Sequence, residues 1–156
     1  MIAELAERYG VIEQTYYCSP NWQKVVEWRK NAPKGRSMVW LGNFPRDNST
    51  ESVARTEAFL QERLYEMAKT GFDGIDQVQI HVRTDLTKTD PLCPSTPFLK
   101  KVISLLHDHG VVANGVTWTE GTNAAVHRLL WDVGFDNFTS DFPEFFAEFA
   151  KTIRTN

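Results

Sequence analysis

Polar side chains alternate with apolar ones over residues 77–83, and this stretch is the part of the sequence best suited to chemistry. Its polar members are Gln77, Gln79, His81 and Arg83. The period of two predicts a strand over 75–82. A polar row is costly inside a parallel sheet covered on both faces, unless it lines a wet cavity or pairs internally. We therefore expect His81 and Arg83 to face a bound anion; the alternative is an edge strand with one solvated face.

Three further candidates stand at the carboxyl ends of predicted strands, where parallel α/β folds place their reactive groups. They are Ser19, Trp118 and Asp141. Trp118 could form the wall of a ligand pocket and donate its indole N–H, or it could pack in the core. Asp141 could orient a substrate or a cation, or it could cap the helix that begins near Pro143.

The remaining histidines and the two cysteines indicate neither a metal centre nor a nucleophile. His107 and His109 are two residues apart in a predicted helix, so they point to different sides of it. His127 stands beside Arg128 in the middle of another predicted helix, and we expect it to be solvated. Cys18 has no base nearby in the sequence, and the two cysteines have no disulfide framework or metal-ligand spacing.

Short strand-like stretches alternate with longer helix-like stretches along the whole chain. Strands are predicted over 11–18, 37–41, 75–82, 111–118 and 136–140. Helices are predicted over 2–9, from the Ser19-Pro20 cap to the residue before Ala32, and over 49–68, 97–109, 123–133 and 142–153. The segment 85–97 contains three prolines and is a loop long enough to suggest a function or an altered connection.

This alternation predicts an α/β fold of parallel strands joined by right-handed crossovers. Five such strands form either an open doubly wound sheet or part of a (β/α)8 barrel, since a whole barrel needs about 250 residues and this chain has 156. The glycine-rich phosphate-binding motifs of open-sheet nucleotide folds do not occur. Periodicity alone leaves both architectures open for a single domain spanning 1–156.

Composition excludes several classes of protein. The 17 basic and 20 acidic side chains give a net charge of −3 and a pI near 5.8, which argues against nucleic-acid binding. No apolar run approaches the roughly 20 residues of a membrane span. The first residues read as an amphipathic helix and not as a signal peptide. We expect a soluble protein, in a compartment that the sequence leaves open.

The stretch 105–144 resembles the C-terminal end of the glycerophosphodiester phosphodiesterase family. The resemblance is carried by a helix that ends at Gly110, the strand end Thr117-Trp118-Thr119, the Arg-Leu-Leu helix at 128–130, and the turn and strand at 133–143 with their Ser-Asp-x-Pro ending. A weaker match, to the family's segment of strand, serine, helix and proline, covers 15–33. Together the two matches span residues 15–144, which is most of the chain, in register.

This resemblance implies the C-terminal part of a (β/α)8 barrel. The complete family enzyme hydrolyses glycerophosphodiesters to glycerol phosphate and an alcohol, with a divalent cation, Mg²⁺ or Ca²⁺. The family's acid–base histidines and metal-binding carboxylates lie in the first half of its barrel, and nothing in this sequence matches them. The resemblance carries over Ser19, Trp118 and Asp141 as supporting residues, and it carries over no catalytic or metal-binding residue.

Half of a barrel has consequences for function and assembly. We expect the isolated chain to bind no cation and to be inactive, or to bind weakly the glycerol end of a substrate. The expected partner is a glycerophosphodiester or a phospholipid headgroup. The alternative function is a non-catalytic module that binds a phosphate or a lipid headgroup, and a third is an unrelated open-sheet binding protein. Exposed sheet edges should make the chain form a homodimer, bind a complementary N-terminal half, or aggregate.

Overall fold

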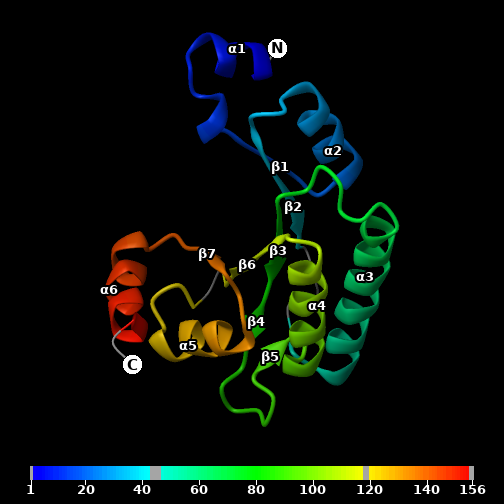
Figure 1. Cartoon of the computed structure of the whole chain (residues 1–156). Coiled ribbons are helices and arrows are strands. Elements are labelled where there is room, and N and C mark those ends of the chain that lie inside the picture. Colours follow the sequence, from blue (N-terminus) through cyan, green and yellow to red (C-terminus); the bar gives the residue numbers. More distant parts are fainter. Residues whose placement is uncertain (1, 43–46, 118–119, 155–156) are drawn as a thin grey trace.

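The computed structural model describes residues 2–42, 47–117 and 120–154, in which α-helices alternate with parallel strands (Figure 1). The α-helices are α1 (Ile2–Arg8), α2 (Trp22–Asn31), α3 (Thr50–Ala68), α4 (Thr96–Asp108), α5 (Ala124–Val133) and α6 (Pro143–Arg154). The strands are β1 (Tyr16–Ser19), β2 (Arg36–Leu41), β3 (Gln77–His81), β4 (Arg83–Thr84), β5 (Leu92–Cys93), β6 (Val112–Val116) and β7 (Asn137–Thr139). None of the described helices is long and apolar enough to cross a membrane.

Five strands form one parallel sheet, and their spatial order, β1-β2-β3-β6-β7, is also their order along the chain. Each strand is therefore added on the same side of the previous one, as in a barrel, whereas the order in a doubly wound sheet reverses. Within the described ranges, β1 and β7 end the sheet and do not pair with each other. The predicted partial barrel is confirmed, and the open doubly wound alternative is wrong.

The two faces of the sheet are separated by the alternation in β3. Val78 and Ile80 are fully buried in the core that the sheet forms with α3 and α4. Gln77 and Gln79 lie on the opposite face, because successive side chains of a strand point to opposite sides, and the helices cover the other side of the sheet (Figure 1). Since β3 is the central strand, the edge-strand alternative for residues 77–83 is wrong.

The same short turn begins two of the strands. Gly74-Ile75-Asp76 precedes β3, and Gly134-Phe135-Asp136 precedes β7. Both glycines have a positive φ, 76° and 113°, which other residues rarely adopt, and the apolar residue that follows each is buried. The carboxylate of the first turn accepts the backbone N–H of Ser37 in β2 at 2.8 Å, and that of the second accepts the backbone N–H of Ala113 in β6 at 2.8 Å. Each carboxylate thus ties a new strand to its neighbour.

A basic side chain from a preceding helix completes each turn. Arg29 of α2 places its Nη2 3.3 Å from Asp76 Oδ1, and His107 of α4 places its Nε2 2.9 Å from Asp136 Oδ2. These contacts lie where the strands begin. His107 is therefore at the end of the sheet opposite to the one where parallel folds place their chemistry. It belongs to the last turn of its helix.

The structure differs from the predicted elements in two segments. The predicted strand 11–18 starts only at Tyr16, because Ile12–Gln14 form a 3-10 turn and Ile12 is buried beside Trp28. The predicted loop 85–97 is partly a hairpin, in which β4 and β5 pair antiparallel and Arg83 stands opposite Cys93. Both differences come from contacts with residues distant in the sequence.

His127 is buried, with 2% of its surface exposed, so the expected solvated position is wrong. Its imidazole lies with its centroid 5.5–6.1 Å from the ring centroids of Phe138, Phe145, Phe146 and Phe149. Nδ1 is 2.9 Å from the backbone oxygen of Asn123. The helical period puts His127 on the inner face of α5, and α6 covers it. This aromatic cluster attaches α6 to α5 and β7.

Replacing Asp76 with alanine should destabilise the protein by about 2 kcal/mol, because the substitution removes a carboxylate that bonds a backbone N–H and pairs with Arg29. Urea unfolding followed by circular dichroism measures the change. Asp73→Ala, an exposed carboxylate in the same loop, is the matched control and should change stability by less than about 0.5 kcal/mol. Equal effects of the two variants would show that the turn carboxylate has no special role.

Candidate functional site

We call the edge of the sheet that is formed by the carboxyl ends of its parallel strands the rim. The most unusual side chain there is His81, at the carboxyl end of β3. Its ring is half-buried and lies 5.3 Å, centroid to centroid, from the ring of Trp40 on the neighbouring strand β2. The indole Nε1 of Trp40 donates a hydrogen bond to Nε2 of His81. A neutral imidazole that accepts at Nε2 carries its proton on Nδ1. The ring is thereby held in one tautomer.

Gly42, which directly follows β2, permits this position of the imidazole. A Cβ atom at residue 42 would lie 2.7 Å from Cε1 of His81 and 2.8 Å from both ring nitrogens. These distances are shorter than any that real Cβ atoms adopt, so a side chain at residue 42 would displace the ring. The end of β2 and the end of β3 are consequently in close contact at the rim, and the absence of a side chain at Gly42 is what allows it.

The pKa of His81 is lowered from 6.5 to about 4, first because burial penalises the charged ring and second because the Arg83 guanidinium is nearby. The imidazole is therefore neutral at physiological pH. It offers hydrogen bonding and not positive charge to any anion at the rim. The expected anion-facing pair is thus one cation, Arg83, beside one neutral ring.

Arg83 and Asp47 bring opposite charges to the same region. The pKa of Asp47 is lowered to about 2, mainly by hydrogen bonds from Ser49 and Ser52 and to a smaller extent by Arg83. Asp47 Oδ1 accepts the backbone N–H of Ser49, which is the N-cap of α3, at 2.8 Å. Asp47 lies outside the strands, in the connection after β2. No periodic pattern or motif includes it, so the sequence did not identify it as a site residue. Only the folded chain places it near Arg83.

The start of α4 lies on the same side of the molecule, but protein carboxylates already occupy it. Asp90 Oδ2 accepts the backbone N–H of Thr96 at 2.9 Å, and Glu57 Oε1 accepts the backbone N–H of Ser95 at 3.0 Å. A helix N-terminus is a general site for anions. Here Asp90 and Glu57 already occupy the N–H groups of Thr96 and Ser95, so these two donors are not available to a ligand.

The other sequence candidates have separate positions. Ser19 ends β1, and its Oγ accepts the backbone N–H of Asn21 at 3.2 Å, in the turn before α2. Asp141 is exposed in the turn before α6, where the hydroxyl of Ser140 accepts the backbone N–H of Phe142 at 3.0 Å. Trp118 lies outside the described residues. A binding role for all three stays a prediction.

Amide side chains cover the face of the sheet that the helices leave bare. Gln79 of β3 donates from Nε2 to Asn114 Oδ1 of β6 at 3.2 Å and to Thr139 Oγ1 of β7 at 2.6 Å. The hydroxyl of Thr139 donates to Asn114 Oδ1 at 3.0 Å. Gln77 belongs to the same face and donates to the sulfur of Met38 at 3.2 Å. The polar row of β3 therefore pairs internally across the strands.

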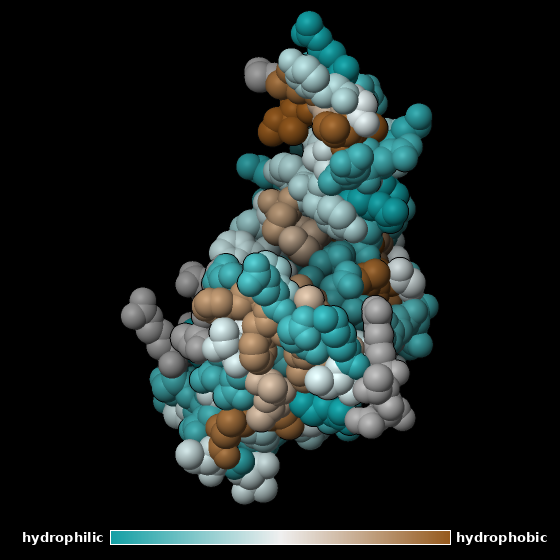
Figure 2. All heavy atoms as spheres, turned by 90° about the vertical axis from the view of Figure 1, so that its left-hand side faces the viewer, coloured by the Kyte–Doolittle hydropathy of each residue, from teal (hydrophilic) through white to brown (hydrophobic). Residues whose placement is uncertain are grey.

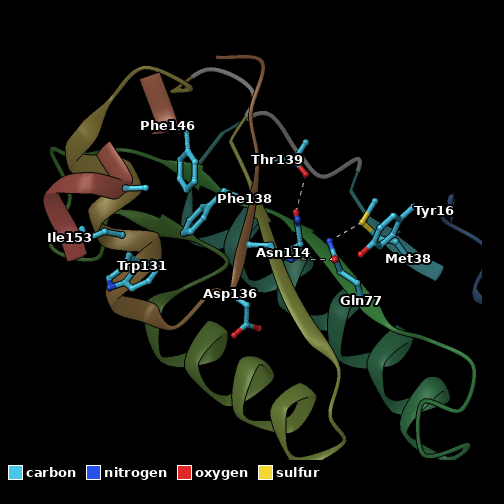
Figure 3. A pocket seen from close by; sticks show the side chains of 12 residues that line it. Tyr16, Met38, Gln77, Asn114, Trp131, Asp136, Phe138, Thr139, Phe146 and Ile153 are labelled. Atoms are coloured by element: carbon cyan, nitrogen blue, oxygen red, sulfur yellow. Dashed lines mark hydrogen bonds between the residues drawn. The ribbon is translucent and has the colours of Figure 1, made fainter. Parts of the chain in front are cut away.

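A cavity of about 490 Å³ opens beside this network, along the free edge of β7 (Figure 3). Gln77 and Asn114 line one side of it, while Trp131, Phe146 and Ile153 line the other (Figure 3). The cavity thus has one amide wall and one apolar wall. His81 and Arg83 are not among its lining residues, so it is distinct from the rim.

The described residues do not form a centre for a divalent cation. Within 2–42, 47–117 and 120–154, no group of three or more His, Cys, Asp or Glu side chains could hold a metal ion. The Mg²⁺ or Ca²⁺ that the family resemblance implies therefore finds no fitting set of ligands in this part of the chain. No cation is assigned to His81, Asp47 or their neighbours.

The titration of His81 provides a direct check of the rim. Its imidazole signals should titrate by NMR with a midpoint near pH 4, and Arg83→Gln should raise that midpoint, because a nearby cation is removed. Lys88→Gln removes a cation of the same hairpin and is the control, expected to leave the midpoint unchanged.

The lowered pKa of His81 also makes the free energy of unfolding depend on pH. The unfolded chain takes up the imidazole proton near pH 6.5 and the folded chain only near pH 4. The stability that the neutral imidazole contributes is therefore complete above pH 6.5 and is lost as the pH falls to about 4. A midpoint near 6.5 would contradict the buried, indole-bonded position.

Comparison with known proteins confirms the architecture. No family model matches the sequence, and no curated protein matches it. The fold resembles a protein from Galdieria sulphuraria assigned as a glycerophosphodiester phosphodiesterase, with a TM-score of 0.58, 14% identity, and coverage of 96% of this chain and 49% of that one. It also resembles a glycerophosphodiester phosphodiesterase from Parabacteroides distasonis, with a TM-score of 0.53, 17% identity, and coverage of 99% of this chain and 49% of that one. This chain spans about half the length of either protein, and its fold is that of half of a glycerophosphodiester phosphodiesterase barrel.

Proposed function

We propose that this chain supplies the C-terminal half of a phosphodiesterase-like barrel and that its rim binds the phosphate of a glycerophosphodiester or phospholipid headgroup. The chain by itself hydrolyses no diester in this proposal. Cleavage requires the first half of the barrel, where the family resemblance places the acid–base histidines and the cation ligands.

One observation carries the proposal. The strands follow one another in chain order across an open parallel sheet, and this sheet matches half of two phosphodiesterase structures. In barrels of this type the reactive groups stand at the carboxyl ends of the strands. That end of the central strand carries His81 and Arg83, which are the residues expected from the sequence to face an anion.

The chemistry of these two side chains suits binding better than proton transfer. Arg83 supplies the positive charge and the forked donors that phosphate oxygens accept. His81, with a pKa of about 4, is protonated in only about one molecule in a thousand at pH 7. It is therefore poorly suited to donate a proton to a leaving alkoxide. In this proposal, His81 orients the phosphate and another part of the barrel provides the acid.

The pairing of His81 with Arg83 also favours a second candidate function, a non-catalytic module that binds a phosphate or a lipid headgroup. A neutral histidine beside an arginine, with no cluster of metal ligands among the described residues, is sufficient for recognition and insufficient for hydrolysis. The two candidates share the rim and differ in whether a catalytic half completes the barrel.

Binding and turnover can be measured separately on the 156-residue chain. We expect no hydrolysis of glycerophosphocholine with added Mg²⁺ or Ca²⁺ by ³¹P NMR. We expect sn-glycerol 3-phosphate to shift the NMR signals of His81 and Trp40. Arg83→Gln should weaken that binding about tenfold, because a charge-assisted contact is lost. Lys34→Gln, an exposed cation far from the rim in the sequence, is the control and should have no effect.

Two results would contradict the proposal. Hydrolysis at the rate of a full-length phosphodiesterase would show that the described half carries its own catalytic groups. Glycerol phosphate binding that is insensitive to Arg83→Gln, or that shifts signals only away from His81, would show that the rim is not the binding site.

A further inference from the structure

The cavity beside β7 extends over the bare face of the sheet as far as its first two strands. Tyr16 of β1 and Met38 of β2 lie at one end of it, and Trp131 of α5 and Ile153 of α6 lie at the other (Figure 3). Its volume of about 490 Å³ falls in the range of roughly 300–1,000 Å³ that is usual for small-molecule sites. The cavity is therefore large enough for a small ligand.

Three amide side chains from three strands meet between these two ends. Gln77 of β3 and Asn114 of β6 are only 6% and 5% exposed, and both line the cavity. Asn137 of β7 is their third neighbour, because its Nδ2 lies 3.5 Å from Oε1 of Gln77. The middle of the cavity is thus a small group of side-chain amides, two of them buried.

The protein uses only part of the hydrogen-bonding capacity of these amides. Asn114 accepts two hydrogen bonds at Oδ1, from Gln79 and from Thr139, but its Nδ2 donates to no described residue. The Nε2 of Gln77 donates to the sulfur of Met38, which is a weak acceptor, and the 3.5 Å contact at its Oε1 is long for a hydrogen bond. Buried amides without good partners are costly and rare. These groups can therefore gain hydrogen bonds from a ligand in the cavity that they line.

The charges around the cavity indicate an uncharged ligand. Among the described residues that line it there is no lysine, arginine or histidine, so it offers no cation to a phosphate group. Asp136 is the one acidic residue of that set, and its Oδ2 already contacts His107 Nε2 and accepts the N–H of Ala113. The cavity thus differs in chemistry from the rim, where Arg83 supplies a positive charge.

The apolar wall sets a second requirement for the ligand. Trp131 is 43% exposed and lines the cavity together with Phe146 and Ile153. In the view from the side of α6, hydrophobic and hydrophilic atoms lie close together over this part of the molecule, while a compact hydrophobic patch lies at the other end, where Ile2 and Leu5 are exposed (Figure 2). A mixed surface with one aromatic wall suits a small amphipathic molecule better than a protein partner.

Among uncharged molecules, a sugar ring meets both requirements. A wholly apolar ligand would leave the amide of Asn114 without a partner. A flat heterocycle stacked on the aromatic wall would turn its other face to the amides, whereas its hydrogen-bonding groups lie along its edge. A pyranose with one axial hydroxyl has C–H groups on one face and the hydroxyl on the other, and each hydroxyl both donates and accepts. Such a ring can contact the aromatic wall and the amides at the same time.

We propose that this cavity binds an uncharged pyranose sugar with an axial hydroxyl. Its C–H face packs against Trp131 and Phe146, and its hydroxyls accept from Nδ2 of Asn114 and donate to Oε1 of Gln77. The sugar site goes beyond the function proposed for the rim. Sugar binding is measured at Trp131 and anion binding at His81, so either proposal can fail alone.

Methyl β-D-galactopyranoside is the probe, because its hydroxyl at carbon 4 is axial. In an NMR titration of the whole ¹⁵N-labelled chain, we expect it to shift the side-chain amide signals of Gln77 and Asn114 and the indole signal of Trp131, with a Kd on the order of 1 mM. The signals of His81 should not move. Methyl β-D-glucopyranoside, which differs only in having that hydroxyl equatorial, is the control ligand and should bind about fivefold more weakly, because the loss of one hydrogen bond has about this effect.

Two pairs of variants locate the binding. Trp131→Ala removes the exposed aromatic wall and should weaken binding of the galactoside about tenfold, whereas Tyr65→Ala removes an exposed ring of α3 outside the cavity and should have no effect. Gln77→Met removes an amide at nearly constant length and should weaken binding about fivefold. Gln61→Met makes the same change at an exposed position of α3 and should leave binding unchanged. Circular dichroism confirms that the four variants are folded.

Each of the other outcomes would overturn the proposal. If the galactoside shifts none of the cavity signals, the amides are satisfied by water and the cavity is not a sugar site. Equal binding of the two sugars would show that the amides do not recognise the axial hydroxyl. Equal effects of Trp131→Ala and Tyr65→Ala, or of the two glutamine variants, would show that binding occurs elsewhere.

Discussion

The structure depends on one constraint: helices cover only one face of its parallel sheet. The apolar side chains of β3 fill the core beneath α3 and α4, while its glutamines lie on the bare face. A polar group there has to find a partner, because an unpaired buried amide is costly. The bonds of Gln79 to Asn114 and Thr139 meet this requirement and join three strands. They also keep this face of the sheet polar.

The two ends of the parallel strands differ in the side chains that they carry. Where the strands begin, the carboxylates of Asp76 and Asp136 hold neighbouring strands in register, with Arg29 and His107 as their partners. Where the central strand ends, the imidazole of His81 is held by an indole over a glycine and kept neutral by burial. The first end carries two carboxylates, each with a basic side chain as its partner, and these contacts favour stability. The second retains a cation and a hydrogen-bonding ring, which suits the recognition of an anion.

Much of the architecture could be predicted because it follows from local pattern. The helix predicted over 49–68 follows from apolar spacing, and in the structure it spans Thr50–Ala68 with Ser49 as its cap. Parallel strands follow from the alternation of strands and helices along the chain. The partial barrel follows from the chain length together with the family resemblance. The hairpin of β4 and β5 could not be predicted, because Arg83 and Cys93 meet only after the loop folds back. The buried position of His127 could not be predicted either, since its aromatic neighbours come mainly from another helix.

The sequence by itself determined the order of helices and strands, the polar row of β3, and the candidacy of His81 and Arg83, because each is a matter of spacing along one segment. Only the tertiary structure decided that β3 is central, that Trp40 and Gly42 confine the imidazole, and that Asp47 lies near Arg83. It also decided that β7 and α6 enclose a groove with two chemically different walls. These features join residues from separate segments, and the distance between such residues is set by how the sheet assembles and not by their separation in the chain.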